Sequence, residues 1–419
     1  MRASIRVLVV ALVMLAVVGG VILSIVIPGP EPDAAPAAVA LFPAPEQWAG
    51  VRWARIEQAD LNERGASVHG VSSYGSWIAA WGESPLANAA EGLRAVVWTS
   101  TGGLAWQQHE LRLVTGQRIW PQNLVVGPAG YLVYALRSPE DNIGLVAVSK
   151  DAEHWVEVGR PPIDTGGPLA ATATGFVTVG VKAGEPLVLA TLDGAAWEKV
   201  TVPARAGAYV LSDVRRTADG FVVAGRVERA GDWDGVLWRS TAGGLLEDLG
   251  ANPTFSDPDR GADVWRTIPF AGGIVVTGSA GEIAECALMG GLVASLGPVT
   301  ADTCPGPPAA AWGSPDGHRW QPVVWPQQAG RPDSMPAIQA ITAGAAGVWG
   351  LVEEAPPGAD KNVVGLWTSS DGIEWRRIGN GMPLEVGGFT GPTVGLPGRL
   401  VVFAWTGTGN AVWVGTPLG

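Results

Sequence analysis

The chain has 419 residues, a formal net charge of −12 and only 16% charged residues, against roughly 25% in an average soluble domain. The acidic balance and the lack of a basic run argue against nucleic acid and anionic membrane surfaces as partners. Gly (59), Pro (33) and Trp (20) are abundant, which indicates many turns and large buried rings. Since helical periodicity is absent beyond the N-terminal region, we expect an all-β fold.

The first apolar stretch, residues 7–27, contains 21 uncharged positions and follows Arg2 and Arg6. As a helix it would span about 31 Å, close to the roughly 30 Å hydrocarbon core of a bilayer. A cleaved signal peptide has a shorter apolar region with a small-x-small site just behind it, and the nearest such site here is Ala38–Ala40. We therefore expect an uncleaved single-pass signal anchor, with cleavage before Leu41 as the alternative.

The N-terminal organisation follows from this anchor. Residues 1–6 would form a cytoplasmic tail, and the bulk of the chain would be extracytoplasmic at the cell membrane. Residues 28–46 are rich in Pro and Ala, which is typical of an extended linker. Residues 47–419 would form the extracytoplasmic domain.

A short pattern, Ser/Thr-x-Asp-Gly-x-x-Trp, recurs along this domain. Asp and Ser accept hydrogen bonds from nearby backbone N–H groups, and Gly supplies a positive φ, so the pattern predicts the turn of a hairpin. The Trp then opens the returning strand. The four best copies cover residues 149–155, 191–197, 314–320 and 369–375, and worn copies begin at Ser100 and Ser240.

The pattern resembles the Asp-box (BNR, sialidase-type) repeat, in a variant whose Asp and Trp stand one residue closer together than is usual. The resemblance covers the chain from about Trp48 to its end and implies a β-propeller, because that repeat lies on the outer rim of propeller blades. It implies structural rather than catalytic roles for the motif residues. These are Asp151, Asp193, Asp316, Asp371, Trp155, Trp197, Trp320 and Trp375.

Seven segments share a second signature, a Gly that precedes a short apolar strand. They begin at Gly75, Gly130, Gly175, Gly220, Gly273, Gly347 and Gly398. Each has a weaker strand before it and a second strand after it, and the strand behind the motif completes four. We therefore predict a seven-bladed β-propeller behind an N-terminal transmembrane helix, with six or eight blades as the alternatives.

The seventh unit lacks an outer strand, since the chain ends soon after Val412–Pro417. At the other end, Trp53–Ile56 has the outer-strand pattern and no unit of its own. Pairing the two would close the ring and remove an exposed sheet edge.

The fifth unit carries an insertion near residues 280–309 that contains both cysteines, Cys286 and Cys304. Two cysteines in an exported chain usually pair, so we expect a disulfide. Closing this loop would contribute about 3 kcal/mol on the chain-entropy account.

Charged residues gather in loops on the face where propellers generally meet ligands, although loops are polar in any protein. They are Glu83, Glu91, Arg94, Arg137, Glu140, Asp141, Arg226, Glu228, Arg229, Asp232, Asp234, Glu353, Glu354, Asp360 and Lys361. Asp257, Asp259 and Asp263 lack the Gly and terminal Glu of a calcium loop, so no metal or cofactor is expected.

The family that the motif resembles includes sialidases. These enzymes use three Arg to bind the substrate carboxylate, a Tyr nucleophile assisted by Glu, and an Asp acid/base. Their early Arg-Ile-Pro string is absent, and its nearest counterparts are Arg55–Glu57 and Arg266–Pro269. Tyr131 and Tyr134 fall within a predicted strand. The four His are scattered, and no nucleophile elbow or phosphate loop appears.

These observations favour a monomeric, membrane-anchored propeller that serves as a binding or scaffolding module for a protein, peptide or cell-wall glycan. A carbohydrate-active hydrolase of sialidase-like type is the alternative. Two carboxylates or an Arg trio at the channel mouth would favour the enzyme, and exposed Trp or Tyr without such a cluster would favour binding.

Overall fold

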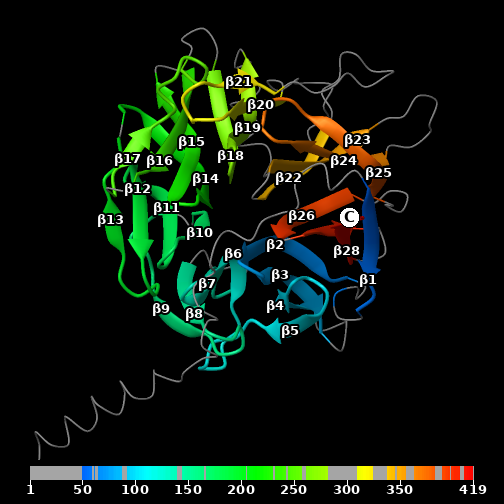
Figure 1. The fold of residues 1–419 in the computed structure, drawn as a ribbon. Helices are drawn as coiled ribbons and strands as arrows, with labels where there is room; N and C mark the ends of the chain where they lie inside the picture. Colours follow the sequence, from blue (N-terminus) through cyan, green and yellow to red (C-terminus); the bar gives the residue numbers. More distant parts are fainter. Residues whose placement is uncertain are drawn as a thin grey trace, which may run out of the picture. The chain divides into compact units, whose positions relative to one another are not determined.

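The computed structural model describes residues 50–418 with gaps, and it confirms an all-β, seven-bladed propeller (Figure 1). The gaps are 59–60, 62–64, 87–91, 139–143, 165–166, 204, 230–231, 242–243, 257–260, 282–308, 324–336, 345–346, 355–362, 383–388, 397 and 406–409. The predicted tail, anchor, linker and disulfide, and nearly all of the predicted insertion, lie outside the described residues. Within them, no helix has the length and hydropathy to cross a membrane.

Each blade is a four-stranded antiparallel sheet. Blades 1 to 3 are β2 (Ser67–Tyr74), β3 (Trp77–Pro85), β4 (Leu93–Thr101), β5 (Trp106–Glu110); β6 (Trp120–Gly127), β7 (Gly130–Leu136), β8 (Gly144–Ser149), β9 (Val156–Gly159); and β10 (Leu169–Ala171), β11 (Phe176–Lys182), β12 (Glu185–Thr191), β13 (Glu198–Val200).

The next three blades follow the same order. Blades 4 to 6 are β14 (Ala208–Arg216), β15 (Phe221–Arg229), β16 (Asp232–Ser240), β17 (Leu246–Asp248); β18 (Gly261–Phe270), β19 (Gly273–Gly281), β20 (Ala309–Ser314), β21 (Gln321–Pro322); and β22 (Ala337–Gly344), β23 (Gly347–Glu354), β24 (Val363–Ser369), β25 (Arg376–Met382).

Blade 7 is built from both ends of the domain, as the sequence predicted. Its strands are β26 (Phe389–Leu396), β27 (Arg399–Trp405), β28 (Asn410–Pro417) and, as the outer strand, β1 (Val51–Ile56). β1 runs antiparallel to β28, with Val51 opposite Pro417 and Ile56 opposite Val412. The innermost strands then contact one another all the way round, from β2 through β6, β10, β14, β18, β22 and β26 back to β2.

The hydrophobic core lies between blades rather than in one place. Each of the seven blade interfaces has its own apolar cluster, because both faces of every sheet are covered by a neighbour. This explains why the strands are short and apolar at successive positions instead of alternating. Trp98 in β4 and Trp238 in β16 are fully buried at equivalent positions of blades 1 and 4.

Strand directions alternate within a blade and therefore define two faces. The turn between the third and fourth strands, here called the outer turn, lies on the same face as the turn between the first and second strands. We call this the outer-turn face. The connections between blades and the turn between the second and third strands lie on the opposite face.

Candidate functional site

The recurring motif forms the outer turns of blades 1 to 6, and its contacts are clearest around Asp371. Its Oδ1 accepts hydrogen bonds from the backbone N–H of Ile373 (2.8 Å) and Glu374 (3.0 Å) and from Ser369 Oγ (2.9 Å). Gly372 has φ +76°, which is why glycine suits that position. Backbone N–H groups in a tight turn lack acceptors in the neighbouring backbone, and the Asp371 carboxylate supplies the missing acceptor.

The other complete copies repeat this arrangement. Asp316 accepts from the N–H groups of His318 and Arg319, both at 2.9 Å, and Asp151 accepts from those of Glu153 and His154, also at 2.9 Å. Asp193 departs from it, since the N–H of Ala195 (2.9 Å) is its one hydrogen-bond donor among the described residues.

The motif tryptophans fall into two groups. Trp155 Nε1 donates to Ala152 O (2.9 Å) and Trp375 Nε1 to Gly372 O (3.3 Å), which ties each ring back to its own turn. The buried Nε1 atoms of Trp197 and Trp320 have no such partner among the described residues. Trp155, Trp320 and Trp375 belong to apolar clusters between blades, and Trp197 packs against another such cluster.

The electrostatics of these turns do not suit acid catalysis. Burial opposes the charge on Asp371, but hydrogen bonds from Ile373, Glu374 and Ser369 outweigh it and lower the pKa of that carboxyl. The pKa of Asp151 is held well below its usual range by the same competition. A general acid needs the opposite shift, a carboxyl that keeps its proton near neutral pH.

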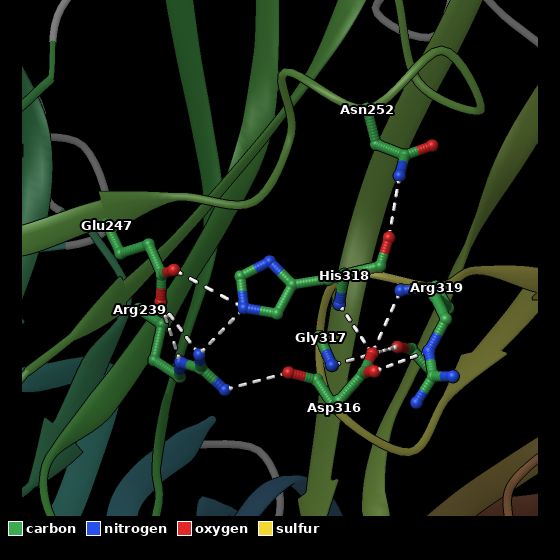
Figure 2. A network of polar contacts seen from close by, with 8 residues as sticks. Arg239, Glu247, Asn252, Asp316, Gly317, His318 and Arg319 are labelled. Carbon is green, nitrogen blue, oxygen red and sulfur yellow. Dashed lines mark hydrogen bonds and ion pairs between the residues drawn. The ribbon is translucent and has the colours of Figure 1, made fainter.

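The outer turns also hold neighbouring blades together, and Figure 2 shows this for blade 5. Arg239, on β16 of blade 4, donates to the backbone O of Asp316 (3.1 Å) and binds Glu247 (2.7 Å). Asn252 Nδ2 donates to the backbone O of His318 (2.7 Å). The bond from Arg239 to Asp316 thus joins blade 4 to blade 5, and the bond from Asn252 joins the segment after β17 to the outer turn of blade 5.

The innermost strands line the central channel and share a feature that the sequence did not reveal. In six blades the first strand has a β-bulge at about the same level. The bulged positions are His69, Gln122, Ser212, Trp265, Gln339 and the pair Gly391–Pro392. A bulge breaks the alternation of a strand and can re-aim side chains, and bulges are enriched near functional sites.

Charge on the innermost strands is confined to blades 4 and 5. The seven strands contain three Arg and two Asp, and all five lie on β14 and β18: Asp213, Arg215, Arg216, Asp263 and Arg266. This strip of the channel wall is therefore net positive in a chain of net charge −12.

Both aspartates of the strip are already engaged. Asp213 is buried and accepts from Thr267 N (2.9 Å), Thr267 Oγ1 (3.2 Å) and Arg215 Nε (3.0 Å to its Oδ1). Asp263 forms an ion pair with Arg226, whose guanidinium also lies 3.9 Å from the ring centre of Trp233. These contacts neutralise the carboxylates and fix blade 5 to blade 4.

Trp265 and Arg266 differ from these paired groups. Trp265 is 45% exposed, and Arg266 beside it is exposed with no hydrogen bond or ion pair to any other described residue. Consecutive residues of a regular strand point to opposite faces, so the bulge at Trp265 accounts for the exposure of both. An exposed indole beside an uncompensated guanidinium is a composition typical of binding hot spots.

At the outer-turn end of the channel, a contact links two blades that are not neighbours. The guanidinium of Arg216 in blade 4 lies over the ring of Tyr74 in blade 1, 4.5 Å from its centre. Both residues are the last of their innermost strands. This cation–π pair bridges the wall of the channel across two intervening blades.

The candidate residues weighed from the sequence are only partly brought together. Arg226 and Asp263 form an ion pair between blades 4 and 5, and Asp234 is buried in β16. Arg137 instead binds Glu157 within blade 2. Residues Glu91, Glu140, Asp141, Asp257, Asp259, Asp360 and Lys361 lie outside the described residues, and the side chains of Arg229, Asp232, Glu353 and Glu354 are likewise not described.

Those candidates for catalysis or metal binding that the structure describes do not form a recognisable centre. Among the described residues, no group of three His, Cys, Asp or Glu could hold a metal ion. Tyr134 is buried in β7, and the pKa of Tyr131 is raised by burial and by Asp151, which disfavours a nucleophilic phenolate. Arg215 and Arg216 are engaged with Asp213 and Tyr74, so three unoccupied Arg do not converge here.

No protein-family model matches the chain, and no curated protein matches it. Solved structures do match in fold. A structure of YCF48 bound to D1 peptide is 12% identical, with a TM-score of 0.48, 91% of this chain covered and 100% of that one. A Trypanosoma rangeli sialidase is 10% identical (TM-score 0.41; 91% of this chain, 60% of that one).

A polysaccharide lyase, an ulvan lyase, is similar at 12% identity, with a TM-score of 0.48 and coverage of 86% and 95%. At such identities the likeness concerns the fold alone. The seven four-stranded sheets and their strand order place this chain among the seven-bladed β-propellers.

Proposed function

We propose that the protein is a membrane-anchored, extracytoplasmic binding or scaffolding module for a protein, peptide or cell-wall glycan. Its ligand binds on the channel wall of blades 4 and 5. The observation that carries the proposal is the pair Trp265 and Arg266, both exposed on β18 and without a polar partner among the described residues. The motif carboxylates in the outer turns serve the fold.

The residues around this pair support binding over chemistry. The nearest carboxylates, Asp213 and Asp263, each form an ion pair with an Arg and are therefore already engaged within the wall. A rigid β-sheet wall with its own ion pairs fixes the exposed groups in advance, which lowers the entropy cost of binding.

The test is quantitative capture from an envelope extract by the detergent-solubilised full chain. A Trp265→Ala/Arg266→Ala variant should lose the captured ligand, while Arg376→Ala, an exposed arginine on the outer strand β25, should retain it. Equal capture by both variants would contradict the site. Glycoside hydrolysis that survives purification and is lost with Arg266→Ala would instead favour the hydrolase.

A further inference from the structure

The channel wall across from Trp265 carries two exposed polar side chains. In a closed ring of seven, blades 1 and 2 lie opposite blade 5 (Figure 1). His69 of β2 and Gln122 of β6 occupy the bulged positions of these two blades, and both are exposed. Because neighbouring blades cover both faces of each sheet, an exposed side chain within an innermost strand faces the channel. His69 and Gln122 therefore lie across the channel from Trp265, at the level of the bulges.

The two polar side chains differ in their contacts. Nε2 of His69 lies 3.0 Å from Ser67 Oγ. Gln122 has no hydrogen bond from its carboxamide to any other described residue. A carboxamide offers two N–H donors and an acceptor oxygen, so Gln122 can bind a hydroxyl group in either direction.

The charge on the blade 5 side of the channel is uncompensated at one point. The two aspartates of β14 and β18 each have an Arg partner. Arg216 lies over the neutral ring of Tyr74, whereas Arg266 is exposed and has no polar contact with any other described residue. A guanidinium presents a rigid fork of N–H donors that matches the two oxygens of a carboxylate. Arg266 therefore suits an anionic group next to the Trp265 ring.

The bulges distinguish between two classes of ligand. An extended peptide binds a sheet by adding a strand to a regular edge. In six of the seven blades the innermost strand, whose free edge borders the channel, is interrupted by a bulge. A bulge disrupts the regular edge that such pairing requires. The channel wall thus offers side chains rather than a continuous strand edge, which favours a glycan over an extended peptide.

The side chains at the bulge level match the groups of one acidic sugar residue. The C–H groups of a pyranose ring carry a small positive charge and pack against the negative face of an indole such as Trp265. The carboxylate of a uronate is the planar anion that Arg266 can bind through two parallel hydrogen bonds. The hydroxyl groups of the sugar are donors and acceptors, like the carboxamide of Gln122.

We propose that the ligand is an acidic polysaccharide and that the channel binds one of its uronate residues. The sugar ring packs on Trp265, its carboxylate binds Arg266 and its hydroxyl groups contact Gln122. The inference rests on the proposed function and names the class of ligand that its site takes. The chain's net charge of −12 does not prevent this binding, since repulsion between distant charges is screened beyond about 8 Å at physiological salt.

The test is isothermal titration calorimetry of the detergent-solubilised full chain with tetrasaccharides of galacturonate and of glucuronate. Their methyl esters are the matched probes, because they keep the sugar rings and lose the charge. We expect at least one uronate to bind about tenfold more tightly than its ester, with an advantage that shrinks as salt is added. Binding of neither uronate, or equal binding of acid and ester, would overturn the inference. Tighter binding of oligoglutamate or of sialyllactose would also overturn it.

Variants assign the two parts of the recognition. Arg266→Gln should lower the affinity for the uronate about tenfold, to that of the ester, and leave the affinity for the ester unchanged. Trp265→Ala and Gln122→Ala should weaken both probes, and Arg376→Ala should weaken neither. Unchanged melting temperatures exclude misfolding as the cause. If Arg266→Gln does not fold, Arg266→Lys, which keeps the charge without the fork, should still bind the uronate more weakly than wild type while the ester binds equally.

Capture from the envelope extract separates this inference from the proposed function. If the Trp265→Ala/Arg266→Ala variant loses the captured ligand but the wild type binds no uronate, the site stands and the ligand class is wrong. Unchanged capture by that variant would overturn both.

Discussion

Asp371 allows the contribution of one motif carboxylate to be measured against an internal reference. It binds two backbone N–H groups and a hydroxyl, whereas Asp193 receives a single N–H bond at the same turn position. Asp371→Ala should therefore cost about 1 kcal/mol of unfolding free energy, and Asp193→Ala a few tenths. Urea denaturation of both variants checks this. An equal loss of unfolding free energy in both variants would mean that the hydrogen bonds to the turn carboxylate do not determine that loss.

The same residue predicts how stability responds to acid. Its pKa is lowered in the folded state, so the native protein binds the proton less readily than the unfolded chain. Stability from this group is present above the ordinary Asp pKa near about 4 and is lost as pH falls through the lower folded value. Asp371→Asn should flatten the fall in melting temperature below about pH 4. An unchanged acid slope would contradict the assignment.

At the scale of the element, the outer turn acts as a contact between blades. Gly372 and Gly244 have nearly the same φ, +76° and +74°, but different surroundings. A Cβ on Gly372 would lie 2.7 Å from Val275 Cγ2 in blade 5, whereas a Cβ on Gly244 would meet no atom within 4 Å. The pair thus separates backbone strain from packing between blades.

Gly244→Ala should cost roughly 1–2 kcal/mol, which is the strain of a left-handed Ala. Gly372→Ala should cost a further 1–3 kcal/mol, since Val275 must move within a filled interface. Thermal and chemical unfolding of the two variants measure the difference. Ala152 shows that a positive φ of 63° is tolerated where the methyl group fits into the core. Equal losses of unfolding free energy in the two variants would show that packing of this turn against blade 5 contributes nothing.

The sequence predicts these elements well where the signal is local. The Asp-x-x-x-Trp spacing and its Gly identify the outer turns, and counting strands identifies β1 as the missing strand of blade 7. The channel strip had a weaker signal, three Arg and two Asp in β14 and β18 where the other innermost strands carry no charge. Trp265 and Arg266 are both exposed only because of a bulge, and a bulge depends on pairing with β19. Tyr74 and Arg216 meet across two blades, which no local pattern records.

At the scale of the whole molecule, stability comes from seven interfaces that close on themselves. β1 contacts both its own blade and the neighbouring one. It pairs with the edge of β28, and its Val51 and Trp53 pack into the apolar cluster between blades 6 and 7. Trp53 lies so close to Gly415 that a Cβ there would be 2.9 Å from the indole ring. The six residues of β1, from the start of the described chain, thus complete blade 7 and its interface with blade 6.

Deleting residues 47–57 should therefore destabilise the entire propeller rather than blade 7 alone. The deletion exposes the edge of β28 and removes the burial of Val51 and Trp53, a loss of roughly 3–6 kcal/mol by area. A fall in melting temperature of at least roughly 5 °C follows for a domain of this size. The matched control deletes eleven residues of the linker, 35–45, and should melt like the intact protein. If both deletions melt together with the wild type, the pairing of β1 with β28 contributes nothing to the ring, and each blade interface must be stable by itself.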